Sequence, residues 1–383
     1  MIAPRALLLA SGSEDVLWRP YGYRDVAHRI RRQYATLGAD GSFDLVEDLT
    51  PHGYTPKLRQ AIFTWFNTHL KGDSTPVIDD VTDFVEPEEN LLVFGGKLPE
   101  NDQMRRIDTL LVKQAELPNV TDAAAWRTHQ EAAIRRLREL TFRYLPRDCT
   151  PRARDRRQDG SESNGARFAT DVFDTADGLT LSMKIRRLQD AAWPVPTVAY
   201  AMQPEARSTF AGGGSSRPGI ASPFATAGVE VRNTGVTSVG PGYLWTLRRV
   251  YPLLGQTLPE RQVSDLLAGI ALLRREKATG PVAVFGQGYT APLAVYAAVL
   301  DPEVREVILA DLPQSHADPQ TPEFLGILRI GDLPHNLALL YPRPITFVGT
   351  MPAAYEWTRQ VYEKLGAAER IRVIASAQQW QPR

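Results

Sequence analysis

Hydrophobic and polar residues near the start of the chain follow two alternating patterns. Residues 5–11 form a short apolar run ended by Gly12, which is typical of a strand buried on both faces of a parallel sheet. Apolar side chains then recur at helical spacing over residues 23–36, and residues 43–47 form a second strand pattern. A further amphipathic helix is predicted for residues 56–70. Because two parallel strands cannot cover their own edges, we expect this segment to be the end of a larger sheet.

The same alternation of strand and helix patterns resumes in the second half of the chain, after residue 166. It predicts a doubly wound, mostly parallel α/β sheet. The predicted strands are residues 179–185, 196–202, 228–232, 282–285, 306–310, 344–348 and 371–374, and the predicted helices are residues 259–276 and 291–300.

The middle of the chain is less regular. Residues 74–121 contain prolines and one short apolar piece, residues 91–94, which predicts an edge strand. Residues 123–140 have the pattern of a helix packed across the outside of a domain. Residues 150–165 are polar, charged and glycine-containing, so we place a linker there. The expected organisation is part of a first domain over residues 1–73, a connector over residues 74–165 and a second domain over residues 166–383.

One segment of the chain occurs twice. Residues 3–9 resemble residues 341–347, and the sequence Tyr-Ala-Thr-Leu-Gly ending at Gly38 resembles Tyr-Glu-Lys-Leu-Gly ending at Gly366. The second copy is nine residues shorter in the loop that follows its first strand. We therefore expect one near-complete copy of a fold, together with the C-terminal part of another copy.

Two residues of the first copy are candidates for acid–base chemistry. Asp15 follows the first strand and His52 follows the second, and the ends of parallel strands meet at one edge of a sheet. A histidine base needs a carboxylate on its far nitrogen, which holds one tautomer while the histidine takes a proton from a nucleophile. Glu14 is the alternative acid. The competing interpretation is a turn-capping aspartate and an unrelated surface histidine.

A serine nucleophile should precede the acid in this chain order, and the first copy offers no suitable serine. Ser11 and Ser13 stand before Asp15, but neither begins a strand–turn–helix. We therefore expect the nucleophile of this site to lie outside the chain.

The second copy has the shape of a nucleophile elbow without its serine. An apolar strand at residues 282–285 leads through Gly286-Gln287-Gly288 into an apolar helix, and Gly288 stands at the nucleophile position. Glycine adopts the strained backbone of such a turn without steric cost, so its presence preserves the fold and removes the nucleophile. A coincidental tight turn is the competing interpretation.

The other members of a catalytic site are also missing from the second copy. The position that corresponds to His52 is Trp380, and the shortened loop removes the counterpart of Asp15. Without a positioned base, neither Tyr289 nor Thr290 is expected to act as a substitute nucleophile.

Composition narrows the possible partners. Lys plus Arg and Asp plus Glu each number 44, so no net charge draws the chain to nucleic acid or to an anionic membrane. Cys149 is the only cysteine, which leaves no internal disulfide or thiolate metal site. Residues 281–300 are uncharged, but glycine and proline interrupt them, so they predict strand, turn and helix rather than a membrane span. We see no export signal in the first ten residues.

No cofactor or metal site is predicted. Residues 212–219 are rich in glycine but lack the Lys-Ser/Thr ending of a phosphate-binding loop. Asp311, His316, Asp318 and His335 lack the spacing of metal ligands, and we expect them to be structural.

Four sequence motifs together resemble bacterial tandem α/β-hydrolases of the acetylxylan esterase type. The resemblance implies an α/β-hydrolase fold, with Asp15 as the acid and His52 as the base of a Ser-His-Asp site that hydrolyses esters of acetylated carbohydrate through an acyl-enzyme. It also implies an intact first domain with a serine elbow, which this chain lacks, and a degenerate second domain. The motifs are residues 3–15, His52-Gly53-Tyr54, residues 232–235 and residues 331–335.

The leading hypothesis is therefore that the chain is the C-terminal portion of a carboxylic-ester hydrolase. In this hypothesis the chain is N-terminally incomplete and inactive alone, and another polypeptide supplies the missing half-domain. The alternative is a non-catalytic pseudo-hydrolase with a structural, carbohydrate-binding or partner-binding role, which Gly288 and Trp380 favour. A peptidase of the prolyl-oligopeptidase type shares the triad order, but nothing in the chain resembles its propeller. Compartment and oligomeric state do not follow from the sequence.

Overall fold

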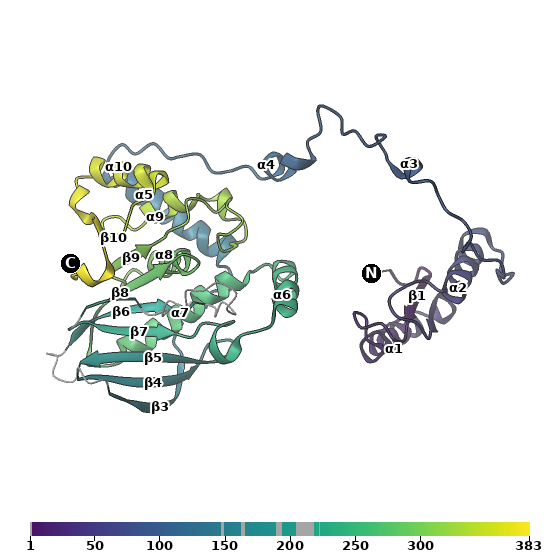
Figure 1. Ribbon diagram of the computed structural model, residues 1–383, viewed down its shortest axis with the longest axis horizontal. Coiled ribbons are helices and arrows are strands. Elements are labelled where there is room, and N and C mark those ends of the chain that lie inside the picture. The colour runs from purple at the N-terminus through teal and green to yellow at the C-terminus, as the bar shows by residue number, and fades with distance from the viewer. Residues whose placement is uncertain (1, 147–148, 162–164, 189–193, 204–217, 222) are drawn as a thin grey trace. The chain divides into compact units, whose positions relative to one another are not determined.

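A computed structural model of the chain describes residues 2–146, 149–161, 165–188, 194–203, 218–221 and 223–383. It contains two compact units, which we call unit 1, residues 1–102, and unit 2, residues 103–383 (Figure 1). The boundary falls inside the predicted connector, and the predicted connector helix belongs to unit 2. None of the described helices combines the length and apolar character needed to cross a membrane.

Unit 1 is built on the predicted strand–helix–strand–helix order. Strand β1, Leu7–Gly12, pairs in parallel with β2, Phe43–Asp48, and helix α1, Pro20–Thr36, connects them. Thr55 caps the N-terminus of helix α2, Pro56–Phe66, because its hydroxyl accepts the Leu58 N–H at 3.3 Å. The helix continues as a π-helical turn over Asn67–Lys71. In the described part of unit 1, β1 and β2 form a sheet of two strands only.

The segment after α2 differs from the prediction. The expected strand at residues 91–94 is wrong, because α3, a single helical turn, covers Glu88–Leu91 and the chain then turns without pairing to any described strand. Its apolar side chains are exposed and cannot supply the buried face that a strand needs.

Unit 2 contains a nine-stranded mixed sheet among its described residues, in the order β11-β10-β9-β8-β6-β7-β5-β4-β3 (Figure 1). The six strands β6 to β11 are mutually parallel, whereas β3, β4 and β5, the last of which includes the predicted strand at residues 179–185, extend one side with antiparallel pairing. The strands are β3 (Arg152–Ser161), β4 (Ala166–Asp174), β5 (Thr180–Leu188), β6 (Val195–Ala201), β7 (Ala225–Val229), β8 (Thr279–Gln287), β9 (Glu306–Ala310), β10 (Ile345–Val348) and β11 (Ile371–Ile374).

Strand β3 occupies most of the segment where we predicted a polar linker, and that prediction is wrong. Its charged side chains are compatible with an edge strand because they pair with carboxylates on β4. The Arg156 Nε lies 2.8 Å from Asp171 Oδ1, and the Arg154 Nε lies 2.6 Å from Asp174 Oδ2. A composition that indicates a solvated loop thus also describes a charged strand at the edge of a sheet.

Unit 2 has several helices and a core that involves both faces of the sheet; the helices at residues 107–111 and 241–253 contribute no buried residue to that core. Alternate residues of the central strands enter two separate clusters: Ala199, Val284 and Leu309 pack in the larger one, and Val198, Phe285 and Ile308 in the smaller one. The helices are α4 (Ile107–Leu111), α5 (Ala123–Arg136), α6 (Pro241–Leu253), α7 (Leu258–Arg274), α8 (Thr290–Leu300), α9 (Leu333–Ala338) and α10 (Glu356–Lys364). All eleven residues of α8 are buried, which explains its uniformly apolar sequence.

The repeat seen in the sequence is present in the structure. In unit 1 the Tyr34 hydroxyl donates to the Arg5 carbonyl at 2.6 Å, and in unit 2 the Tyr362 hydroxyl donates to the Arg343 carbonyl at 2.8 Å. Both copies end their helix at a glycine with positive φ and continue through a short 3-10 turn into the second strand. The β1–α1–β2 segment therefore corresponds to β10–α10–β11.

Strand register corrects the length difference between the copies. Phe43 pairs with Leu7, 36 positions earlier, and Ile371 pairs with Ile345, 26 positions earlier. The second copy is therefore ten residues shorter, not nine, because Ser11 rather than Gly12 corresponds to Gly349.

Candidate active site

The structure brings Asp15 and His52 together. Asp15 lies in the loop after β1 and His52 in the loop after β2, and the parallel pairing of these strands places both loops at the same edge. His52 Nδ1 lies 2.7 Å from Asp15 Oδ2. A carboxylate only accepts hydrogen bonds, so Nδ1 carries the proton and Nε2 is left as an acceptor.

Glycine at position 12 allows the two loops to approach each other. A Cβ at this position would lie 2.3 Å from the Thr50 carbonyl oxygen and 2.6 Å from that of Pro51, the residue before His52. Both contacts are with backbone atoms that no side-chain rotation can relieve. Gly12 therefore has a positioning role that its sequence context, a strand end, did not reveal.

Asp15 is held as a carboxylate. Its Oδ1 accepts the backbone N–H groups of Leu17 at 2.7 Å and Trp18 at 3.1 Å, and its side chain is only 4% exposed. Burial alone would raise the pKa of the Asp15 carboxyl, but the hydrogen bonds from His52, Trp18 and Leu17 outweigh that effect and lower the pKa below its usual value. The carboxylate is thus pre-formed beside the imidazole.

The alternative acid, Glu14, takes no part in this arrangement. Its backbone N–H donates to the Thr50 carbonyl at 3.0 Å, while its side chain is exposed and makes no described hydrogen bond to His52. The competing interpretation of Asp15 and His52 is partly correct, because Asp15 does cap a turn and the His52 side chain is 62% exposed. The two side chains are nevertheless bonded to each other.

The pair faces an open cavity of about 380 Å³. Exposed aromatic side chains of Trp18 and Tyr54 lie at its edge, and Ser11 lies in its wall. Among the described residues of unit 1, no serine hydroxyl hydrogen-bonds to His52 Nε2. The cavity is lined by residues 9–12, Asp15, Trp18, Tyr23 and residues 52–54.

The strand–turn–helix predicted around Gly288 is present in unit 2. Gly288 links β8 to α8 with φ +53°, and a Cβ built there would meet no atom within 4 Å. Gly286 differs, since its Cβ would lie 2.5 Å from the Ala291 Cα. Packing of α8 against β8 therefore requires glycine at 286, whereas position 288 is open space that now holds no side chain.

Neither residue that follows Gly288 is a free nucleophile. The Thr290 hydroxyl accepts the Gln287 N–H at 3.0 Å, and the Tyr289 hydroxyl donates to Gln262 Oε1 at 2.9 Å. Burial raises the pKa of Tyr289 well above its usual value. Trp380, at the position that corresponds to His52, is 1% exposed and packs edge-on against Phe224, with ring centroids 5.1 Å apart.

The four residues without metal-ligand spacing have structural partners, among them Asp318, whose Oδ1 accepts the Gln320 N–H at 2.9 Å. His316 Nε2 lies 2.6 Å from the Tyr296 hydroxyl, and burial lowers the pKa of His316 to about 4. His335 accepts the Asp332 N–H at 3.2 Å, and Asp311 accepts from Gln287 at 2.8 Å. The described residues contain no group of three or more His, Cys, Asp or Glu side chains able to hold a metal ion.

The motif that begins at Arg232 has a structural explanation. Arg232 bonds the fully buried Asp265 through its backbone N–H and its guanidinium, with Nη2 2.7 Å from Oδ1, and it also reaches Asp177. Burial alone would lower the pKa of Arg232, but the two carboxylates raise it. This ion network holds the loop after β7 in place.

Comparisons with known proteins identify a fold and no sequence family. No family model matches the chain, and no curated protein matches it. Among solved structures, a proposed acetyl xylan esterase from Bacteroides fragilis is 14% identical, covers 70% of this chain and 80% of its own, and superposes with a TM-score of 0.56. Two further structures are similar. A methylesterase is 13% identical, covers 69% of this chain and 61% of its own, and has a TM-score of 0.48. A glucuronoyl esterase from Solibacter usitatus is 14% identical, covers 70% of this chain and 96% of its own, and has a TM-score of 0.47.

The first of these structures shares its fold with this chain. The chain has an α/β structure with a large mixed sheet and flanking helices, and this fold superposes on that of the proposed esterase from Bacteroides fragilis. At 14% identity, the likeness extends to the fold alone.

Proposed function

We propose that Asp15 and His52 are the acid and base of a serine carboxylic-ester hydrolase whose nucleophile comes from polypeptide outside residues 1–383. The observation that carries this proposal is the 2.7 Å bond between His52 Nδ1 and Asp15 Oδ2, two residues that line an open cavity. The fold favours the carboxylate form of Asp15, and the bond of that carboxylate to Nδ1 fixes the imidazole tautomer that general-base chemistry needs.

The mechanism assigns one task to each residue. His52 Nε2 accepts the proton of the serine hydroxyl as that oxygen attacks the ester carbonyl, and then donates it to the departing alcohol. Water hydrolyses the acyl-enzyme by the same route. Asp15 stabilises the imidazolium that forms in each step and keeps the ring oriented.

The repeat supports a polypeptide partner for unit 1. Strand β10 lies between β9 and β11, whereas its counterpart β1 pairs only with β2 in the described residues. The residues of β10 are largely buried, and those of β1 are mostly half-buried. A parallel apolar strand equivalent to β9 would cover the free edge of β1, and the elbow serine would follow the strand beyond it, as Gly288 follows β8 beside β9.

The proposed substrate is an acetylated carbohydrate. Its support is the resemblance of residues 3–15 and 52–54 to acetylxylan esterases, together with the carbohydrate-esterase architecture of unit 2. An open cavity with aromatic side chains at its edge, Trp18 and Tyr54, suits a sugar ring.

The test is to sequence the DNA upstream of Met1, express any encoded strand-and-elbow polypeptide together with the full chain, and measure acetate release from acetylated xylan oligomers. We expect the two polypeptides together to be active. We expect His52→Gln or Asp15→Asn to lower kcat at least 10³-fold, since triad members act as one unit. His28→Gln, on the exposed face of α1, is the matched control and should retain activity.

The chain alone provides the complementary measurement. It should form no covalent adduct with a fluorophosphonate probe. If the chain alone forms an adduct and His52→Gln does not, the proposal that the nucleophile lies outside the chain is contradicted. A completed protein that retains full activity with Asp15→Asn and His52→Gln would contradict the proposed roles.

A non-catalytic role for unit 2 is the second candidate, favoured by Gly288 and Trp380 in place of the nucleophile and base. If no polypeptide completes unit 1, this role is what the whole chain performs. It requires unit 2 to bind something, and one cavity beside the elbow has the necessary features.

A further inference from the structure

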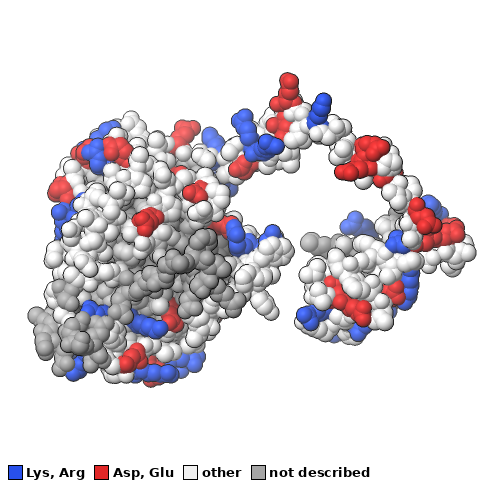
Figure 2. Space-filling view, in the orientation of Figure 1, with Lys and Arg blue, Asp and Glu red and all other residues white. Residues whose placement is uncertain are grey.

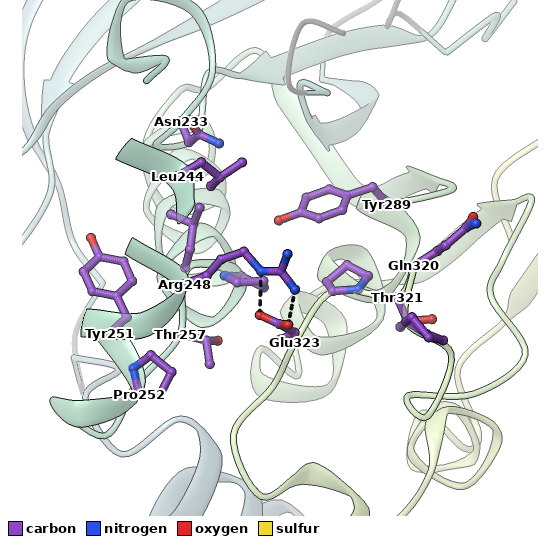
Figure 3. A pocket seen from close by; sticks show the side chains of 14 residues that line it. Asn233, Leu244, Arg248, Tyr251, Pro252, Thr257, Tyr289, Gln320, Thr321 and Glu323 are labelled. Carbon is purple, nitrogen blue, oxygen red and sulfur yellow. Dashed lines mark hydrogen bonds and ion pairs between the residues drawn. The ribbon is translucent and has the colours of Figure 1, made fainter. Parts of the chain in front are cut away.

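A second cavity, of about 250 Å³, lies in unit 2 beside the turn that contains Gly288 (Figure 3). Helix α6, the start of α7, the loop after β7, Tyr289 and the loop at residues 319–323 enclose it. This cavity is independent of Asp15 and His52, because every residue that forms it lies in unit 2. Its size suits a molecule of about ten non-hydrogen atoms.

Asn233 contributes a hydrogen-bond donor with no partner. It is only 9% exposed and has a left-handed backbone with φ +64°. Its Oδ1 accepts the Val239 N–H at 3.1 Å, so the side-chain NH₂ points the other way, into the cavity (Figure 3). Among the described residues, that NH₂ has no acceptor. An unpaired donor directed into a cavity can pair with a ligand oxygen.

The surrounding loop is rigid enough to hold this donor in position. Arg232, the preceding residue, is fixed by the buried Asp265, and its carbonyl accepts Gln262 Nε2 at 2.9 Å. Gln262 is fully buried, and its Oε1 accepts the hydroxyl of Tyr289, whose ring forms the opposite wall. The Asn233 amide and the Tyr289 ring are thus positioned by one network before any ligand arrives.

The rest of the lining is mostly apolar, with Tyr251, Gln320 and two threonines as its uncharged polar members. Its walls include Leu244, Leu258, Pro259 and Pro322. The only charged side chains in the lining, Arg248 and Glu323, form an ion pair with each other (Figure 3). A ligand carrying a charge or many hydroxyls would bury polar groups without partners, which is unfavourable.

We propose that this cavity binds a small neutral ester or amide, with its carbonyl oxygen on the Asn233 NH₂ and its hydrocarbon part against the apolar walls. The single donor of the Asn233 amide can form a hydrogen bond with the carbonyl oxygen of such a ligand. Position 288, next to Tyr289, has no hydroxyl, so the ligand is bound and released unchanged. Unit 2 is then a receptor for an ester-like group rather than a catalyst.

The test uses N-phenylacetamide as the ligand and the full chain as the receptor. We expect binding with a Kd of roughly 1 mM, the range for a ten-atom ligand, measured by saturation-transfer NMR and titration. N-ethylaniline, which has a CH₂ in place of the carbonyl, should bind about tenfold more weakly, as one lost hydrogen bond predicts. The bound amide should be recovered intact.

Two variants locate the binding site. Asn233→Asp preserves the acceptor for the Val239 N–H and the side-chain shape, but it turns a carboxylate oxygen toward the ligand carbonyl, so we expect at least tenfold weaker binding. Leu244→Trp fills the cavity from α6 and should abolish binding. Asn101→Asp, an exposed asparagine in unit 1, is the matched control and should bind like the parent.

Three outcomes would overturn the proposal. They are no saturable binding of N-phenylacetamide, equal binding of N-ethylaniline, and parent-like binding by both Asn233→Asp and Leu244→Trp. Asp15 and His52 are unchanged in both variants, so a negative binding result would not affect the proposed role of unit 1. A negative result in the co-expression experiment would likewise not affect the proposed ligand of this cavity.

Discussion

The two copies of the strand–helix–strand unit share a frame and differ at the positions where chemistry would occur. In β1–α1–β2 and in β10–α10–β11, the same tyrosine-to-carbonyl hydrogen bond ties the helix to the start of the first strand. The first copy inserts ten residues that carry Asp15 and ends its second strand toward His52. The second copy lacks that loop and buries Trp380 instead. The same frame thus holds a polar edge in the first copy and a packed edge in the second.

The largest expected difference between the copies is in stability. Trp380→Ala should destabilise unit 2 by about 3–5 kcal/mol, because it removes a fully buried aromatic side chain that packs on Phe224. His52→Ala should barely change the stability of unit 1, since most of that side chain is in solvent. Urea denaturation followed by hydrogen exchange, resolved by peptide, measures each unit separately. Similar losses in both variants would mean that position 52 is also a packing position.

A smaller effect is expected at the elbow. Gly288→Ser places a side chain in open space but in a left-handed backbone, which should cost about 1–2 kcal/mol and leave unit 2 folded. The variant should remain unreactive toward a fluorophosphonate, because Trp380 occupies the position of the base. The matched substitution Gly286→Ser should unfold unit 2, since its Cβ would overlap the backbone of α8. Rapid labelling of Gly288→Ser would show that another group serves as its base.

The smallest effect is local and depends on pH. The pKa of Asp15 is lowered in the fold, so its contribution is present above the ordinary value of 3.8 and is lost as pH falls through the lowered value. We expect the amide signals of Leu17 and Trp18, which donate to this carboxylate, to shift only below about pH 4 in an NMR titration. The corresponding loop after β10 starts at Gly349 and has no such carboxylate, so its amides should be unaffected. A shift of Leu17 and Trp18 centred above pH 5 would contradict the hydrogen-bonded carboxylate.

The sequence predicted most of the parallel strands, the long helices and the meeting of Asp15 with His52, because these depend on local periodicity and on the geometry of parallel strand ends. It failed for β3, whose arginines and aspartates indicate a linker unless the carboxylates of β4 are known to lie opposite. The sequence also did not reveal the side-chain donor of Asn233. Its direction depends on the Val239 N–H, which donates to Asn233 Oδ1, and on Asp265, which is distant in sequence and fixes the neighbouring Arg232.

Charge is distributed without a dominant sign, as expected from equal numbers of acidic and basic residues. On the face shown in Figure 2, basic and acidic side chains are interspersed. The net charge of the chain therefore gives no long-range attraction to a partner of either sign.

The contrast between Gly286 and Gly288 also has an evolutionary meaning. The packing of α8 against β8 constrains position 286 of this turn and leaves position 288 free of that constraint. A mutational step at position 288 changes what the turn can do without changing whether the chain folds. An active site of this shape can therefore be lost in a single substitution, and the remaining scaffold stays available for selection on other tasks.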